Sequence, residues 1–244
     1  MTKVFEALER AESEKADQAR RIPSPDRREV APPVSDGSIE ETLIGLYQSI
    51  RNALGDSETH VVEFVGTTES AGASALLCKF VQVVAYRLGR RVLYVGVNAR
   101  PGREMLVSPS QTDGLGEAIR LGRSLDDACR KLDGAELYAM RLSAAGSEET
   151  AALIDAPKFQ EALEKLKERF ELIAFDPPPV AIAPDAFALA SVSNGTVLVV
   201  ESERTRWQVA DAVRTRLLAQ GGRLLGVILN KRKHHIPGFI YNRL

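Results

Sequence analysis

The sequence has few of the residues that metal proteins and nucleophilic enzymes depend on. It contains two cysteines and three histidines in 244 residues. Cys78 and Cys129 form no CxxC pattern and no Cys/His cluster, which argues against a metal site and suits a reducing cytosol. His234 and His235 are adjacent and lack ligand spacing. Because no histidine lies in a Ser/His/Asp or Cys/His arrangement, the sequence predicts no nucleophilic hydrolase.

Strong net charge and long apolar runs are also missing. The net charge is −1, so no overall field favours nucleic acid or a membrane, and no nucleic-acid-binding motif is present. No run of about 18 apolar residues appears, so we expect no membrane span. The opening segment is charged throughout, so we expect no signal peptide. The composition, 44% hydrophobic and 27% charged, is that of an ordinary globular protein.

The N-terminal part predicts a helix and a linker before a single domain. Residues 1–20 place apolar residues on one helical stripe between charges. Residues 21–38 hold four prolines and few apolar residues, which is typical of a linker. Residues 39–244 then form one domain, which begins with a helix at 39–54.

The domain alternates strand-like and helix-like segments. Six apolar runs predict strands at 61–66, 91–96, 136–142, 171–176, 195–200 and 223–229. Helix-like segments lie between them, at 73–88, 113–121, 124–131, 157–169, 184–191 and 205–219. Several strands are continuously apolar, which indicates burial on both faces. We therefore predict an α/β fold: a doubly wound, mostly parallel sheet flanked by helices, with an N-terminal helical extension.

The stretch GTTESAGASAL, residues 66–76, has the setting of a phosphate-binding loop between a strand and a helix. In such loops, backbone N–H groups converge on phosphate, a lysine adds charge, and a Ser or Thr hydroxyl holds Mg²⁺. Gly72 and Ser74 keep the glycine and the hydroxyl, but Ala73 stands at the lysine position. The anion cradle is retained in part and the cation is lost. The alternative is a plain tight turn in which Ser74 caps the helix.

Polar residues follow three other predicted strands, at the edge where ligands bind in such sheets. Gly96 and Asn98 stand where catalytic relatives of such folds place acids, and Arg100 and Arg103 either contact phosphate or lie in solvent. Asp176 ends another strand. An acid there orients the Mg²⁺ shell, with Ser74 as the second candidate ligand, or caps the loop.

The last predicted strand runs into Asn230, which either reads a base edge or caps the strand. The segment 231–244 then combines basic and aromatic residues. Such a tail either rests on anionic lipid or an acidic partner, or is simply a solvated end.

These segments together resemble the cytoplasmic domain of bacterial tyrosine kinases of capsule and exopolysaccharide synthesis (CpsD/CapB-like), relatives of the MinD/ParA P-loop ATPases. The opening MTKVFEALERAE, the run ALIDAPKFQEALEKLKERFELIAFDPPPV and the close LLGVILNKRKHHIPGFIYNRL follow the family's order over nearly the whole chain. The resemblance implies a P-loop NTPase-like fold. It also makes Asp176 the Walker B acid.

The chain departs from the family at several functional positions. Ala73 replaces the Walker A lysine, and Gly96 and Asn98 replace the two Walker A′ acids, although Arg100 matches the arginine that follows. The family's C-terminal tyrosine cluster is absent, since Tyr241 stands alone. The family's oligomerisation motif has only its last residue here, which leaves homo-oligomer formation open; its positions are Gly45, Gln48 and Arg51.

The departures predict a catalytically inactive or strongly impaired pseudokinase, a cytoplasmic scaffold or regulator at the inner membrane. The resemblance implies an inner-membrane co-polymerase (chain-length protein) or an active kinase paralogue as its partner. We expect no cofactor, with weak ATP or ADP and Mg²⁺ binding left open at a vestigial nucleotide site. That site comprises Gly72, Ala73, Ser74, Arg100, Asp176 and Asn230.

Two alternatives remain open from the sequence. The first is a divergent, active ATP-dependent tyrosine kinase or ATPase in which Arg100, Arg103 or Lys79 replaces the lysine. The second is a MinD/ParA-like positioning protein that docks on a membrane or on polar partners.

Overall fold

The computed structural model describes residues 37–97, 106, 114–132, 134–142 and 147–232. The chain divides into two units, Met1–Ala31 and Pro32–Leu244, and every described residue lies in the second. The predicted helix at 1–20 therefore lies outside the described residues.

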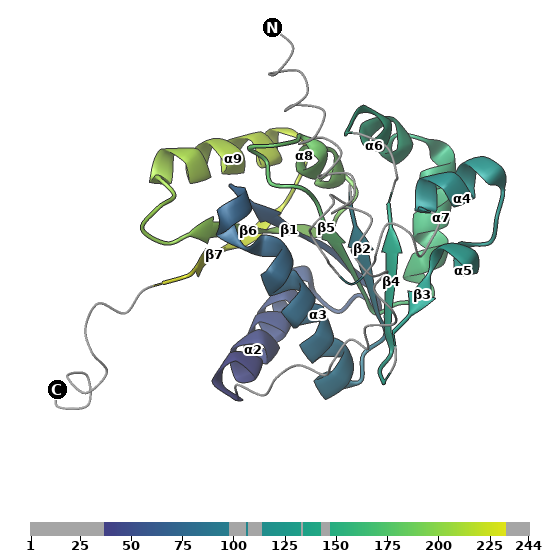
Figure 1. Ribbon diagram of the computed structural model, residues 1–244, viewed down its shortest axis with the longest axis horizontal. Coiled ribbons are helices and arrows are strands. Elements are labelled where there is room, and N and C mark those ends of the chain that lie inside the picture. Colours follow the sequence, from purple (N-terminus) through teal and green to yellow (C-terminus); the bar gives the residue numbers. More distant parts are fainter. Residues whose placement is uncertain (1–36, 98–105, 107–113, 133, 143–146, 233–244) are drawn as a thin grey trace, which may run out of the picture. The chain divides into compact units, whose positions relative to one another are not determined.

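A seven-stranded sheet forms the centre of the second unit (Figure 1). The strand order is β3-β4-β2-β5-β1-β6-β7, and all neighbours pair in parallel except β3 with β4. The strands are β1 (His60–Gly66), β2 (Val92–Gly96), β3 (Arg130–Lys131), β4 (Leu137–Arg141), β5 (Leu172–Asp176), β6 (Gly195–Glu201) and β7 (Leu224–Asn230). The predicted mostly parallel sheet is confirmed, and each of the six predicted strands is present.

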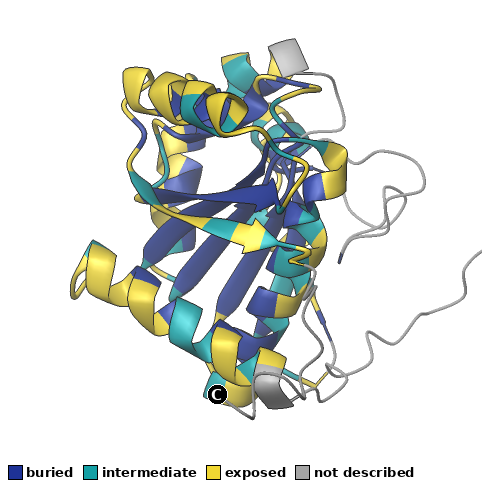
Figure 2. Ribbon diagram, turned by 90° about the vertical axis from the view of Figure 1, so that its left-hand side faces the viewer, coloured by how far each residue is buried: buried dark blue, intermediate teal, exposed yellow. Residues whose placement is uncertain are grey.

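Helices cover both faces of the sheet (Figure 2), and every residue of β1, β2, β5 and β6 is buried. The helices are α2 (Gly37–Leu54), α3 (Ala73–Leu88), α4 (Leu115–Leu121), α5 (Leu125–Ala128), α6 (Ser147–Ile154), α7 (Pro157–Lys167), α8 (Asp185–Leu189) and α9 (Trp207–Ala219), with a 3-10 turn η1 (Glu69–Ala71). On one face α3 packs on β1, β2 and β5, and α2 packs on α3. Side chains of α4 to α9 fill the other face.

The predicted helix at 124–131 is wrong in its second half. Ser124 caps α5 by accepting a hydrogen bond from the N–H of Asp126, but the backbone is already extended at Cys129. The following Arg130 and Lys131 form β3, which pairs antiparallel with β4. Sheet pairing overrides the helical pattern here, because tertiary contacts with β4 outweigh the weak helix propensity of so short a segment.

An aromatic cluster joins α2 and α3 to the sheet. The Phe80 ring of α3 lies 5.2 Å from the Phe64 ring of β1 and 6.3 Å from the Tyr47 ring of α2, between ring centroids. Phe64 and Phe80 are fully buried and Tyr47 is 4% exposed. Phe80 therefore links Tyr47 of α2 to Phe64 of the sheet.

Within the described part of the chain, one helical stretch, Glu69–Leu88, is long and apolar enough to cross a membrane by length and composition alone. In this fold 44% of that stretch is buried. Its apolar residues Leu77, Phe80 and Val84 are fully buried, and α3 packs on β1, β2 and β5. Core helices of α/β domains pass the same test, so the composition alone is weak support for a membrane span.

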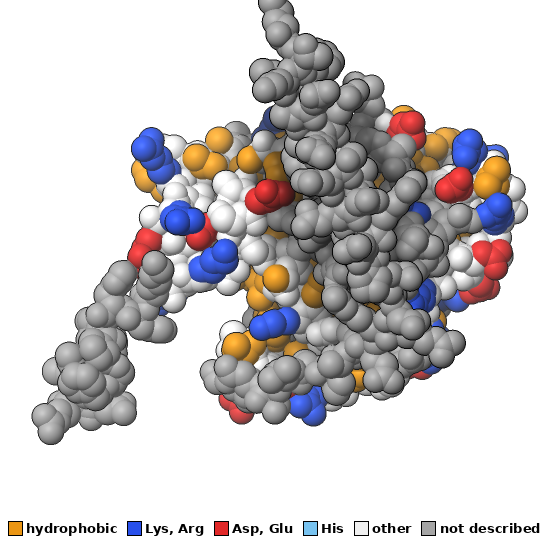
Figure 3. Space-filling model, viewed as in Figure 1, with side chains coloured by type: hydrophobic (Ala, Val, Ile, Leu, Met, Phe, Trp, Pro, Cys, Tyr) orange, Lys and Arg blue, Asp and Glu red, His pale blue; other side chains and the backbone are white. Residues whose placement is uncertain are grey.

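Exposed apolar side chains gather at the β7 side of the sheet. The described residues include eight exposed large hydrophobic side chains, and five of them belong to α9 and β7. Trp207 is 72% exposed and Leu229 is 64% exposed; the others are Val209, Leu218 and Val227. Figure 3 shows hydrophobic side chains over α9. We call these five side chains the apolar edge.

Candidate phosphate-binding site

The loop between β1 and α3 has the backbone geometry of an anion cradle. After β1 the chain makes the 3-10 turn η1, and Gly72 then adopts a left-handed conformation with φ of 77° directly before α3. In the part of the chain that the structure describes, no side-chain cap bonds to the start of α3. The first N–H groups of a helix lack intrahelical acceptors and carry the positive end of the helix dipole, so this terminus is suited to a phosphate.

Asn230 ties the end of β7 to this loop. Its side-chain N–H donates to the carbonyl oxygen of Ala71 at 2.8 Å, and its Oδ1 accepts from the N–H of Lys231 at 2.9 Å. A Cβ added at Gly72 would lie 2.8 Å from the Asn230 side-chain nitrogen and 3.7 Å from Cε of Lys231. Asn230 therefore caps the loop, and the exposed Lys231 passes beside it.

Replacing Gly72 by alanine is expected to destabilise the fold by about 2–3 kcal/mol. The left-handed backbone accounts for about 1–2 kcal/mol, and displacement of Asn230 from Ala71 for about 1 kcal/mol more. Gly89→Ala is the matched control, because Gly89 has φ of 62° and nothing within 4 Å of its added Cβ. Urea unfolding measures both variants. Equal losses would show that Asn230 does not restrain the loop.

Ser74, Asp176 and Tyr94 form a hydrogen-bonded cluster at the carboxyl ends of the strands. The Ser74 hydroxyl donates to Oδ1 of Asp176 at 2.8 Å, and the Tyr94 hydroxyl donates to Oδ2 at 2.5 Å. Tyr94 is fully buried and Asp176 is 1% exposed. Burial, followed by the negative charge of Asp176, raises the pKa of Tyr94 well above its usual value. The phenol is therefore protonated and acts as a donor at neutral pH.

Gly96 leaves room that Tyr94 fills. Gly96 lies opposite Asp176 of β5 on one side and Arg141 of β4 on the other. A Cβ added at Gly96 would lie 3.5 Å from Cε1 and 3.7 Å from the hydroxyl oxygen of Tyr94. The phenol thus stands next to the position at which the resemblance would place a carboxylate.

The structure brings most of the sequence-predicted residues together at one edge of the sheet. Ala73 begins α3 and is 8% exposed, next to Gly72 and Ser74. Asp176 contacts Ser74, and Asn230 contacts the loop through Ala71. Three predicted residues lie outside the described residues: Asn98, Arg100 and Arg103.

Sequence reasoning missed Tyr94. The sequence does contain a signal for it, a tyrosine within a continuously apolar run. Such a tyrosine is expected to be buried, and a buried phenol needs a hydrogen-bond partner. A position two residues before Gly96 on the same strand shares the face of Gly96. Identifying Asp176 as the partner also required the register between β2 and β5.

The site is a poor match for the Mg²⁺ ion that P-loop enzymes use. Mg²⁺ demands octahedral oxygen coordination and is usually held by carboxylates together with phosphates. Here Ser74 and Asp176 bond to each other, Gly96 offers no carboxylate, and a neutral phenol stands beside it. Among the described residues there is no group of three or more His, Cys, Asp or Glu side chains placed to hold a metal.

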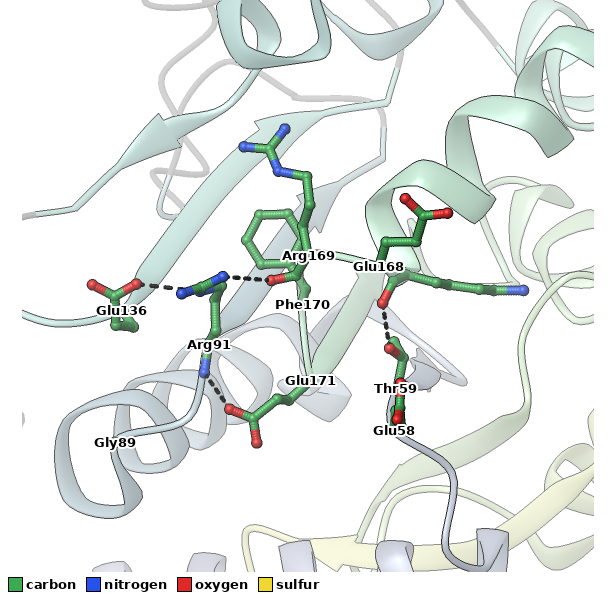
Figure 4. Close-up of a pocket in the computed structure, with 10 residues that line it drawn as sticks. Glu58, Thr59, Gly89, Arg91, Glu136, Glu168, Arg169, Phe170 and Glu171 are labelled. Atoms are coloured by element: carbon green, nitrogen blue, oxygen red, sulfur yellow. Dashed lines mark hydrogen bonds and ion pairs between the residues drawn. The ribbon is translucent and has the colours of Figure 1, made fainter.

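A pocket of about 380 Å³ lies at the opposite end of the strands (Figure 4). Its lining precedes β1, β2, β4 and β5 and is rich in charge, and several of these charges are paired. Arg91 contacts Glu136 at 3.4 Å, and its N–H donates to Glu171 at 3.2 Å. Arg169 pairs with Asp126. This charged pocket lies apart from the loop, at the opposite ends of the strands.

The fold and loop define this chain as a P-loop NTPase-like α/β domain. Comparison with solved structures supports that class. A chimerical protein CapA2B2 matches with a TM-score of 0.71 and 21% identity, over 84% of this chain and 88% of that one. The MinD cell division protein of Aquifex aeolicus matches with a TM-score of 0.57 and 17% identity, over 76% of this chain and 73% of that one.

Sequence comparison with curated proteins identifies more specific relatives. The tyrosine-protein kinase CpsD of Streptococcus agalactiae is 32% identical over 80 residues, 33% of this chain and 35% of that kinase. The succinoglycan biosynthesis transport protein ExoP of Rhizobium meliloti is 28% identical over 184 residues, 73% of this chain and 23% of ExoP. The chain thus spans about a third or less of these two relatives. No protein-family model matches it.

The predicted resemblance is confirmed by both comparisons. The chain is similar to bacterial tyrosine kinases of the CpsD and CapB type, and its fold is that of bacterial tyrosine kinase domains and MinD-like proteins. Its relatives include a protein of exopolysaccharide biosynthesis.

Proposed function

We propose that this protein is a tyrosine-kinase-like scaffold or regulator of bacterial exopolysaccharide or capsule assembly that does not transfer phosphate to tyrosine. One observation carries the proposal: the predicted metal ligands Ser74 and Asp176 bond to each other and to Tyr94, on a loop with Ala73 at the lysine position. Phosphoryl transfer depends on positioned positive charge and metal at the transferred group. Ala73 provides no positive charge, and Ser74 and Asp176 are bonded to each other rather than open to a metal ion.

The partner that we propose follows from the relatives. ExoP is a transport protein whose aligned part is 23% of its length. We propose that the chain acts with the co-polymerase part of such a system, or with an active kinase paralogue, on the cytoplasmic side of the inner membrane. The apolar edge supports an interaction role, because exposed tryptophan is enriched among residues that bind protein partners. Residues 1–20 and 231–244 are further proposed contact segments.

Purified protein is expected to release phosphate from ATP, and to label itself, at the rate of a Ser74→Ala/Asp176→Ala variant. The reason is that the wild-type chain already has Ala73 in place of the lysine that transfer of phosphate requires, so loss of Ser74 and Asp176 removes no further activity. Phosphate release and tyrosine phosphorylation are both measured with Mg²⁺. Ser74→Ala alone serves as the second reference, since it leaves the buried Tyr94–Asp176 bond intact. A wild-type rate above both references would overturn the proposal in favour of a divergent kinase or ATPase.

For the alternative of an active kinase or ATPase, the structure describes one of the three residues that could replace the lysine. Lys79 is exposed on α3 and lies five residues beyond Ser74, which is more than one helical turn from the loop. Arg100 and Arg103, the other candidates, lie outside the described residues. A MinD/ParA-like positioning role would instead show as liposome co-sedimentation that depends on residues 231–244.

A further inference from the structure

Tyr94 is the feature of the site that the proposed function does not require. A scaffold could lose the chemistry of the site through the absence of side chains alone, of the lysine at Ala73 and of the acid at Gly96. Instead, β2 carries a large polar side chain whose hydroxyl reaches the surviving carboxylate at 2.5 Å. The ring is fully buried, and its hydroxyl lies 3.7 Å from where a Cβ of residue 96 would stand.

The two donors to Asp176 differ in how readily they can leave. Ser74 is half-buried at the start of α3, and a hydroxyl rotates to suit its surroundings. The Tyr94 ring is held inside the sheet by burial on every side. If its hydroxyl lost Asp176 without another acceptor, a buried polar group would bear the desolvation cost. Cys78 also lies at hydrogen-bond distance from the Tyr94 hydroxyl, and this second contact holds the phenol in place beside Asp176.

The presence of the Tyr94 phenol beside Gly96, where the family has a carboxylate, also changes the local charge. Two carboxylates at neighbouring strand ends attract a divalent cation, whereas here one carboxylate accepts from two hydroxyl donors. Hydrogen bonds to a carboxylate stabilise its charge without a metal. The N-terminus of α3 is unaffected by this exchange and can still accept an anion.

We propose that Tyr94 closes this site to Mg²⁺, so that a nucleoside diphosphate or triphosphate held at the loop is bound without a metal ion. The inference rests on the proposed function in that no phosphate is transferred at the loop, and it adds that the loop still binds phosphate. Tyr94 is thus a specificity-determining residue, which replaces a metal with an internal hydrogen-bond donor.

The test is calorimetric titration of the full chain with ADP, once with Mg²⁺ and once with EDTA. The variants are Tyr94→Phe and Tyr94→Phe/Gly96→Asp, which remove the hydroxyl and then restore a carboxylate. Tyr138→Phe is the matched control, because its hydroxyl contacts Glu136 at the other end of β4. Thermal melting shows whether each variant is folded.

For the wild type and Tyr138→Phe, the Kd for ADP is expected to change less than about threefold between Mg²⁺ and EDTA. The double variant is expected to bind about tenfold or more tightly with Mg²⁺. Binding that appears only in the double variant and only with Mg²⁺ also supports the inference. If Gly96→Asp does not fold, Tyr94→Phe alone carries the test, with an expected gain of about fivefold or more from Mg²⁺, above the limit set for the wild type.

Two results overturn the inference: wild-type binding that Mg²⁺ strengthens about tenfold, or folded variants that remain indifferent to Mg²⁺. Neither result requires turnover. Phosphate release by the wild-type protein would overturn the proposed function instead, so the two failures are distinguishable.

Discussion

Replacing Glu63 by glutamine is expected to stabilise the folded protein by about 3 kcal/mol at pH 7. Glu63 is fully buried in β1, the central strand between β5 and β6. Its Oε1 accepts from the Thr196 hydroxyl at 2.6 Å, and its Oε2 has no hydrogen-bond partner among the described residues. Burial raises the pKa of this carboxyl to about 8, although the Thr196 hydrogen bond lowers it in part.

The direction of the pH effect follows from proton binding. At acid pH, well below the unfolded pKa of 4.5, the carboxyl is neutral in both states, so its ionisation contributes nothing to the free energy of unfolding. Between that value and about 8, the folded protein keeps the proton that the unfolded chain releases. Stability therefore falls by about 1.4 kcal/mol per pH unit through this window. Glutamine cannot ionise, so the variant lacks this slope, and its advantage shrinks to less than about 1 kcal/mol at pH 5.

Urea unfolding of the two proteins from pH 5 to 8 checks this expectation. Glu171→Gln is the matched control, since Glu171 is an exposed carboxylate paired with Arg90, and its loss is expected to change stability by less than about 1 kcal/mol at any pH. If Glu63→Gln retained the wild-type pH slope, the buried carboxyl would not hold its proton in the folded state.

Phe80→Ala is expected to destabilise the protein by about 3–5 kcal/mol, a large part of the stability of an ordinary domain. The substitution removes a fully buried ring and leaves a cavity between Tyr47 and Phe64. Since Phe80 bridges Tyr47 of α2 and Phe64 of β1, we expect the amides of α2 to lose hydrogen-exchange protection before those of β1.

Denaturant unfolding with hydrogen exchange provides the measurement. Trp207→Ala is the control, because it also removes a large aromatic side chain but from a site that is 72% exposed, and its expected effect is within about 0.5 kcal/mol. A Phe80→Ala loss below about 1 kcal/mol, or equal deprotection of α2 and β1, would contradict the anchoring role.

Much of the fold could be predicted because its strands are buried on both faces. Runs such as VVEFV and LIAFD are apolar whichever way each side chain points, so they identify central strands before any pairing is known. β3 could not be found in this way, since Arg130 and Lys131 are polar and are a strand only through β4. Even VVEFV conceals Glu63, whose burial depends on the helices that cover the sheet.

The candidate site was predictable to the extent that it follows from strand ends. Parallel strands bring their carboxyl ends to one edge, and Ser74 meets Asp176 there, as Asn230 meets the loop. The partner of Tyr94 could not be predicted. Its hydroxyl reaches Asp176 because β2 pairs with β5, which is 80 residues later for the pair Gly96 and Asp176. Such contacts depend on register, which sequence patterns specify only through the buried face.

The hydrogen bond from Asn230 to Ala71 links the loop to the weakest part of the sheet. β7 is an edge strand with one neighbour, and it contains the only exposed residues found in β1, β2, β5, β6 and β7. Edge elements open locally at far lower free energy than a domain unfolds. The rigidity of the cradle therefore depends on this peripheral strand as well as on the bond from Ser74 to the buried Asp176. A ligand at the loop and a protein that covers the apolar edge would each slow the fraying of β7, and so would strengthen each other's binding.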